Sequence, residues 1–129
     1  MRSAVVIGAQ GVIGRYIVEK LASLPDWQVV GLSRRRGQDS ARVRHIAVDL
    51  LDPVEATAKL SDLADATHVF FAAFQPGAGA AADYAKNIVA NRDLLVNSVS
   101  AIDKASARLE RVVLVTGTKY YGSHLGPYK

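Results

Sequence analysis

The sequence predicts an α/β fold in which helices cover both faces of a doubly wound parallel sheet. Short apolar runs rich in β-branched residues alternate with longer segments whose apolar residues recur at helical spacing. This alternation requires crossover connections, which join parallel strands through helices. No repeat, low-complexity tract or linker interrupts the 129 residues, so we expect one domain that buries a substantial core.

The first strand and helix follow from an apolar run and a helical stripe. Residues 3–7 are typical of a buried strand, which Gly8 ends. The next apolar residues are spaced by four, four and three positions, which predicts a helix with a stripe of Ile13, Ile17, Leu21 and Leu24. Pro25 stops this helix, and a second strand is expected at 28–32.

The remaining elements continue the alternation. A third strand at 43–48 leads to a helix that is expected to end near Leu63, with Asp52 as N-cap, Pro53 in the first turn and Glu55 closing a capping box. The next elements are a strand at 68–72, a flexible loop at 76–79, a helix at about 81–107 and a strand at 111–115. The long helix carries an apolar stripe of Ile88, Leu95, Val99 and Ile102. We interpret its Asn87, Asn91 and Asn97 as a solvated face, with backbone bonding as the alternative for Asn91.

Composition excludes several classes of protein. The chain has no cysteine, which excludes disulfide scaffolds, thiolate zinc sites and cysteine nucleophiles, and no metal site is predicted. The longest uncharged stretch, 66–82, is too short and too broken to span a bilayer, and glycines interrupt the N-terminal apolar run before a signal peptide can form. We therefore expect a soluble, cytoplasmic protein with no membrane partner.

The formal net charge of +4 is concentrated in one segment. Residues 34–44 contain five arginines and a single carboxylate, Asp39, so this segment accounts for the whole excess. A nucleic-acid-binding protein usually spreads basic residues over a face and interleaves aromatic residues, which here lie elsewhere. The segment therefore favours a local anion site, and no nucleic-acid partner is expected.

A glycine motif lies where the first strand meets the first helix. Gly8 permits a sharp turn, Gly11 lets backbone amides approach a pyrophosphate, and Gly14 allows close packing of helix on strand. The N–H groups of Val12 and Ile13 would then face the anion. A tight turn without a ligand is the alternative, but the position between strand and helix favours the dinucleotide site of a Rossmann-type fold.

The residues after the second strand predict NADP(H) as the cofactor. An NAD site usually places a carboxylate about 20 residues beyond the glycines, where it binds the ribose hydroxyls. This chain has Ser33, Arg34 and Arg35 there, followed by Arg36, and guanidinium groups suit a 2′-phosphate. We expect Arg34 and Arg35 to make the contact and Arg36 to be a bystander, the alternative being a solvated arginine run.

Two further strand ends complete the expected cofactor site. Asp49 is placed to accept a hydrogen bond from the adenine amino group or, alternatively, to cap a turn, while Leu50 would pack on the adenine ring. Small residues after the fourth strand let the backbone pass close to the ribose and nicotinamide, at Ala72, Ala73 and Phe74.

The segment after the fifth strand carries a family resemblance. It reads Thr116-Gly117-Thr118-Lys119-Tyr120-Tyr121-Gly122, and with the glycine motif and the Asp49-Leu50 pair it resembles the extended short-chain dehydrogenases/reductases. Those enzymes normally carry a catalytic Tyr-x-x-x-Lys on the next helix, whereas this chain has a lysine directly after the strand. That departure resembles the progesterone 5β-reductase/iridoid synthase-like family over essentially the whole chain, together with Ser33-Arg34-Arg35 and Thr67-His68-Val69-Phe70.

The resemblance implies an NADPH-dependent oxidoreductase that transfers hydride to an activated enone or related small carbonyl compound (1,4-reduction). It makes Lys119 the catalytic candidate, with a partner tyrosine expected beyond Lys129, and gives Thr116 a supporting place at the nicotinamide. Residues 1–129 are therefore interpreted as the NADP(H)-binding N-terminal portion of a longer reductase, with the sheet incomplete at its C-terminal side and no turnover by this portion alone.

Two other functions remain open at this point. The first is a nucleotide-sugar epimerase or dehydratase of the extended type, which Lys119 and the missing carboxylate after the second strand disfavour. The second is a non-enzymatic NADP(H)-sensing domain, which fits the missing tyrosine. The substrate, its stereochemistry and the oligomeric state are not fixed by the sequence, and a homodimer is compatible with each of these functions.

Overall fold

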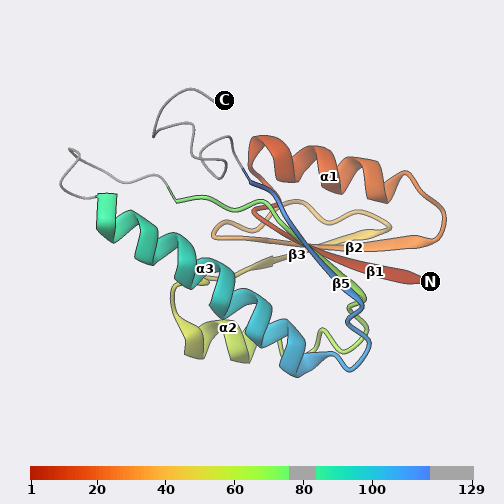
Figure 1. Ribbon diagram of the computed structural model, residues 1–129. Helices are drawn as coiled ribbons and strands as arrows, with labels where there is room; N and C mark the ends of the chain where they lie inside the picture. The colour runs from red at the N-terminus through yellow and green to blue at the C-terminus, as the bar shows by residue number, and fades with distance from the viewer. Residues whose placement is uncertain (76–83, 117–129) are drawn as a thin grey trace, which may run out of the picture.

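The computed structural model describes residues 1–75 and 84–116, which form a sheet between two layers of helices (Figure 1). The elements are β1 (Arg2–Ile7), α1 (Val12–Ala22), β2 (Trp27–Ser33), β3 (Val43–Ala47), α2 (Pro53–Lys59), β4 (His68–Phe71), α3 (Tyr84–Ala105) and β5 (Arg111–Leu114). Helix α1 covers one face of the sheet, and α2 and α3 cover the other. The predicted α/β fold class is confirmed.

The sheet is parallel throughout, with strand order β3-β2-β1-β4-β5. The central strand β1 pairs with β2 on one side and with β4 on the other, so that Ile7 lies opposite both Leu32 and Phe71. The connections turn away from each other after β1 and β4, which opens a crevice at the carboxyl ends of these strands. This crevice is the expected place for a ligand in such a sheet.

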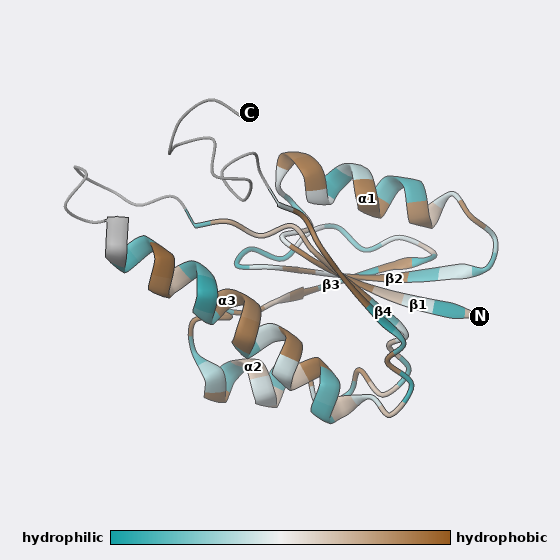
Figure 2. Ribbon diagram, viewed as in Figure 1, coloured by the Kyte–Doolittle hydropathy of each residue, from teal (hydrophilic) through white to brown (hydrophobic). Residues whose placement is uncertain are grey.

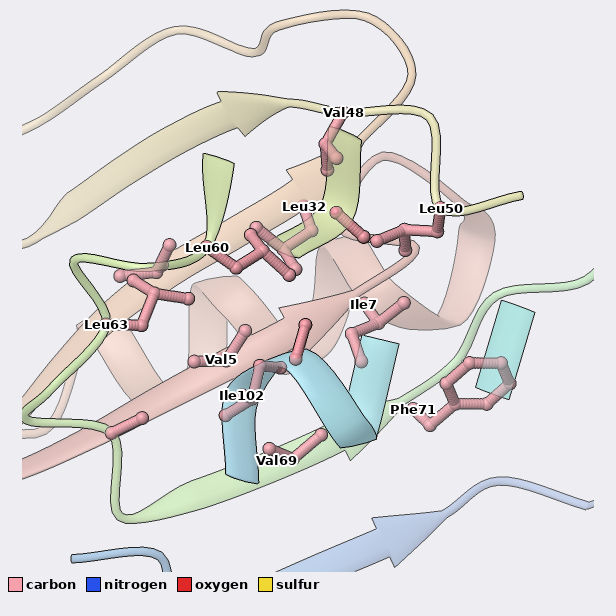
Figure 3. Packing of buried hydrophobic residues seen from close by; sticks show 14 residues of the cluster. Val5, Ile7, Leu32, Val48, Leu50, Leu60, Leu63, Val69, Phe71 and Ile102 are labelled. Atoms are coloured by element: carbon pink, nitrogen blue, oxygen red, sulfur yellow. The ribbon is translucent and has the colours of Figure 1, made fainter. Parts of the chain in front are cut away.

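Alternate residues of β1 point into two separate hydrophobic clusters. Val5 and Ile7 pack toward α2 and α3, whereas Ala4 and Val6 pack toward α1. Figure 3 shows the larger cluster, in which side chains of the sheet meet Val48, Leu50, Leu60, Leu63 and Ile102. Figure 2 shows that the strands are mostly hydrophobic where they cross at the centre, whereas the helices on either side have mixed polarity. Burial on both faces explains the near-continuous apolar strands.

The stripe of α1 differs from the predicted one. Val18 and Leu21 are buried together with Gly14, but Ile13 is 52% exposed, so the expectation for Ile13 was wrong. A Cβ at Gly14 would collide with the carbonyl oxygen of Gly8. This close packing fixes the rotation of the helix and turns Ile13 away from the sheet, toward the crevice.

The start of α2 is confirmed, but its capping box and its end are not. Asp52 accepts hydrogen bonds from the N–H groups of Val54 at 3.0 Å and Glu55 at 3.2 Å. The Glu55 carboxylate reaches past the cap to the Asp49 N–H at 3.3 Å and pairs with Lys59 at 2.7 Å. Both contacts lower the pKa of Glu55 below its usual value, and the hydrogen bond from the Lys59 ammonium has the larger effect.

Helix α2 ends at Lys59, one turn earlier than the predicted end near Leu63. The following residues form turns in which Leu60 and Leu63 are both buried. Both leucines fill the cluster between α2, α3 and the sheet. Their apolar spacing therefore reflects burial in the core and was wrongly interpreted as a continuation of the helix.

Helix α3 is described from Tyr84, and the predicted loop at 76–79 and helical residues 81–83 lie outside the described residues. Ile102 is buried, and Leu95 and Val99 pack against the core as predicted. Ile88 is 55% exposed, which contradicts its assignment to the stripe, because this end of α3 projects beyond the sheet (Figure 1).

Across 1–75 and 84–116, no helix has both the length and the apolar character needed to cross a membrane.

Candidate cofactor site

A cavity of about 780 Å³ lies at the carboxyl ends of β1 to β4. It is lined by twelve residues that were predicted from the sequence: Gly8, Gly11, Val12, Ile13, Ser33, Arg34, Arg35, Asp49, Leu50, Ala72, Ala73 and Phe74. It is also lined by five that were not predicted: Gln10, Leu32, Val48, Gln75 and Leu94. The structure thus gathers residues from four separate strand ends around one cavity, so that a ligand with several distinct parts could contact a different strand end with each part.

The turn after β1 has the tight geometry that its glycines suggested. Gly8 has φ +82°, and a Cβ there would lie 2.8 Å from the backbone of Ala72 and Ala73. The N–H groups of Gly8 and Ala9 both donate to the carbonyl oxygen of Leu32, at 3.0 and 3.1 Å. The turn is therefore locked between β2 and β4, and a side chain at Gly8 would force these neighbours apart.

The N-terminus of α1 opens into this cavity without a side-chain cap. Gly11 is the N-cap residue, and the first turn contains no acidic residue. Val12 and Ile13 carry N–H groups of the first helical turn, which have no acceptor within a helix, and both residues line the cavity. A side chain at Gly11 would come within 3.3 Å of the Gly8 carbonyl oxygen. Bare N–H groups, the helix dipole and a close backbone approach suit an anion such as a pyrophosphate.

The arginines of the basic segment fall into two groups. Arg34 and Arg35 are exposed, line the cavity and form no ion pair with the described residues. The other three are held by the protein: Arg36 pairs with Asp39 at 2.8 Å, Arg44 pairs with Asp62 at 3.0 Å, and Arg42 donates to the carbonyl oxygen of Leu24 at 2.7 Å. Within the described part of the chain, the two arginines at the cavity are thus the members of this segment whose guanidinium groups are not held by another residue.

The loop after β3 forms the opposite wall of the cavity. Asp49 accepts a hydrogen bond from the Leu51 N–H at 3.0 Å, so one carboxylate oxygen caps the turn, as the alternative interpretation supposed. Leu50 is only 5% exposed and lies in the core cluster while it lines the cavity (Figure 3). Its carbonyl oxygen accepts from the Asn97 side chain at 2.9 Å. The loop is therefore held by α3 as well as by its own turn.

Asn91 of α3 clamps the backbone after β4. Its Oδ1 accepts from the Gln75 N–H at 2.8 Å, and its Nδ2 donates to the carbonyl oxygens of Gln75 at 3.0 Å and Asn87 at 2.8 Å. The interpretation of Asn91 and Asn97 as a solvated face was therefore wrong, and the alternative for Asn91, bonding to the backbone, is confirmed. A signal was present in the sequence, because Asn91 falls on the same helical face as Leu95, at a spacing of four.

Replacing Asn91 by alanine is expected to lower the free energy of unfolding by about 1–3 kcal/mol, because both polar groups of Gln75 lose their partner at a partly buried position. Urea unfolding followed by circular dichroism measures the change. Asn87→Ala is the matched control, since the Asn87 side chain makes no hydrogen bond within the described residues. Equal losses for the two variants would contradict the clamp.

Gly14 and Thr116 were predicted at the site but are not among the residues that line the cavity. Gly14 is buried where α1 packs on the glycine turn. Thr116 is exposed and lies two residues beyond β5. Lys119 lies outside the described residues. The roles assigned to Thr116 and Lys119 at the nicotinamide end therefore remain predictions from the family resemblance.

Residues 4–129 match the model of the NAD dependent epimerase/dehydratase family. The chain belongs to this family. The match extends from β1 through the glycine turn to the segment that follows β5, and so includes the cavity.

Curated relatives agree with the resemblance noted from the motifs. The chain is 33% identical over 132 residues to a 3-oxo-Delta(4,5)-steroid 5-beta-reductase of Arabidopsis thaliana, covering 97% of this chain and 32% of the relative. It is 31% identical over 125 residues to an (S)-8-oxocitronellyl enol synthase of Nepeta cataria, covering 92% and 31%. It is 32% identical over 135 residues to a short chain dehydrogenase, gsfE, of Penicillium aethiopicum, covering 98% and 35%. The chain spans about a third of the length of these relatives.

Solved structures share the fold at lower identity. The Bordetella bronchiseptica enzyme WbmH, solved in complex with NAD⁺, matches all of this chain and 42% of its own with a TM-score of 0.77 and 22% identity. A short chain dehydrogenase family protein from Francisella tularensis matches 92% of this chain and 52% of its own with a TM-score of 0.75 and 17% identity. These likenesses confirm a Rossmann-like sheet with flanking helices.

Proposed function

We propose that this chain is the cofactor-binding part of an NADPH-dependent reductase that acts on an activated enone or a related small carbonyl compound. The observation that carries the proposal is the cavity, which combines an uncapped helix N-terminus with two arginines that form no ion pair with any described residue. The residues present fit a dinucleotide. The crowding at Gly8 and Gly14 leaves the turn as bare backbone, and that backbone faces the place of the pyrophosphate.

Arg34 and Arg35 support NADPH over NADH. They stand at the end of β2, where a carboxylate would accept hydrogen bonds from the ribose of NADH. A guanidinium binds phosphate oxygens through a planar fork of donors, and neither group is engaged by a described carboxylate. Asp49 and Leu50 would hold the adenine, and Ala72, Ala73 and Phe74 would border the ribose and the nicotinamide.

NADPH supplies hydride for the β-carbon of a conjugated enone. Hydride addition leaves negative charge on the carbonyl oxygen, and a lysine ammonium with a neighbouring phenol stabilises such an oxyanion by charge and hydrogen bonding. Lys119 is proposed for this role, with a tyrosine beyond Lys129 as its partner and Thr116 in support. The names of two relatives describe the reduction of a 3-oxo-Δ4,5 steroid and the synthesis of an enol, and both names fit this chemistry.

The intact protein, expressed from its whole open reading frame, provides the test. The reductase proposal predicts that NADPH is consumed in equal amount with a small conjugated enone and that the carbon–carbon double bond becomes saturated. Conversion of a nucleotide sugar without net NADPH consumption would instead establish the epimerase or dehydratase function. That function is also compatible with the family match. Tight NADPH binding without turnover of either substrate would favour the sensing domain and contradict the reductase.

A further inference from the structure

Gln10 joins the glycine turn to the basic segment. Its side-chain Nε2 donates to the Ser33 hydroxyl oxygen at 3.1 Å and to the carbonyl oxygen of Arg35 at 2.5 Å. The Ser33 hydroxyl in turn donates to the same Arg35 carbonyl. Gln10, Ser33 and Arg35 all line the cavity, so this network lies in the wall itself.

The strand register explains why these residues meet. In the parallel pairing of β1 and β2, Ile7 lies opposite Leu32, so the residues that follow the two strands leave the sheet side by side. The chain between β2 and β3 contains no helix, and Arg34 and Arg35 are therefore carried by an exposed connection. The Arg35 carbonyl accepts hydrogen bonds from two side chains, which fixes the backbone of this connection at the cavity.

We infer, on the basis of the proposed NADPH site, that Gln10 is a positioning residue that sets the preference for NADPH by holding the backbone of Arg35. Both N–H donors of the Gln10 amide are used within the wall, and so is the Ser33 hydroxyl proton. These groups shape the site, while the guanidinium of Arg35 makes the contact with the 2′-phosphate. Because the arginine backbone is fixed before the cofactor arrives, less conformational freedom is lost on binding.

The test is equilibrium titration of the intact protein and its Gln10→Leu variant with NADPH and with NADH. Leucine keeps the bulk of the side chain and removes both donors. We expect NADPH affinity to fall about three- to tenfold, the effect of one or two lost hydrogen bonds, while NADH affinity stays unchanged. Gln38→Leu is the matched control, since Gln38 is an exposed glutamine of the same connection outside the cavity wall. Gln10→Ala is the second variant, and the circular dichroism of each variant verifies that it is folded.

A double-mutant cycle separates a positioning role from a general structural one. In an Arg35→Ala background, Gln10→Leu is expected to cause no further loss of NADPH affinity, because Gln10 acts through Arg35. An equal loss for NADPH and NADH, or an undiminished loss in the Arg35→Ala background, would overturn the inference. If the parent protein prefers NADPH and Gln10→Leu leaves the ratio of the NADPH and NADH dissociation constants unchanged, only the role of Gln10 is overturned. A parent protein with no preference for NADPH overturns the proposed cofactor as well.

Discussion

Replacing Arg34 and Arg35 together by alanine is expected to weaken NADPH binding far more than NADH binding. Arg34 and Arg35 line the cavity and neither is paired with a described carboxylate, so on the proposed cofactor site the variant removes contacts that only the 2′-phosphate can make. Each lost charge-assisted contact costs about 1.5–3 kcal/mol, so the ratio of the two dissociation constants should shift by about 100-fold or more. Titration of the intact protein with each nucleotide measures this ratio.

A second pair of substitutions separates local contact from net charge. Arg36→Ala with Arg44→Ala also removes two positive charges from the same segment, but these arginines are paired with Asp39 and Asp62. We expect this control to change NADPH affinity only slightly, since its residues act on the cofactor through a screened field. If both pairs of substitutions weaken NADPH equally, or if the first pair weakens NADH as much as NADPH, the arginines do not recognise the 2′-phosphate.

Replacing Lys119 by alanine in the intact protein is expected to lower enone turnover by about 10²- to 10³-fold, the usual effect of removing one group that stabilises an oxyanion. NADPH affinity should remain nearly unchanged, because the proposed contacts of the cofactor lie at the other strand ends. Steady-state kinetics with a conjugated enone and a separate NADPH titration measure the two quantities. A loss confined to turnover therefore identifies a role in the transition state.

Lys104→Ala is the control for the loss of one positive charge and for any loss of activity during purification of a variant. Lys104 is an exposed lysine in the last turn of α3, away from the cavity wall. Its replacement is expected to leave turnover and NADPH affinity as they are in the parent protein. If Lys119→Ala turns over the enone as fast as the parent protein does, Lys119 has no role in the mechanism. The main argument for enone reduction, rather than another reaction of the family, would then be lost.

The strands could be predicted from the sequence because a parallel sheet covered on both faces requires continuous apolar runs. Each predicted strand agrees with the structure to within one residue at each end. The glycine turn could also be predicted, since backbone geometry at Gly8 and close packing at Gly14 leave no room for a side chain. In these elements, local constraints and the fold agree.

The failures have tertiary causes. Leu63 looked helical because it is buried, although the chain leaves α2 at Leu60. Glu55 suits a capping box by its spacing, but the loop that ends β3 brings the Asp49 N–H within its reach. Asn91 binds a segment 16 residues earlier in the chain, and helix propensity does not predict such a contact.

Gln10 was missed because a residue between two glycines is usually judged by its backbone alone. Its partners Ser33 and Arg35 lie 23 and 25 residues away. A crossover through one helix commonly joins neighbouring strands of a parallel sheet, and this rule would have placed the turn after the first strand beside the residues after the second. Combining the motif with the expected register could therefore have found this contact from the sequence.

A crystal structure of the intact protein with NADP⁺ tests the proposed cofactor site most directly. We predict that the pyrophosphate lies over the N–H groups of Val12 and Ile13 and that the 2′-phosphate lies within hydrogen-bond distance of the guanidinium groups of Arg34 and Arg35. A nucleotide bound away from the glycine turn, or a 2′-phosphate turned away from both arginines, would contradict the account.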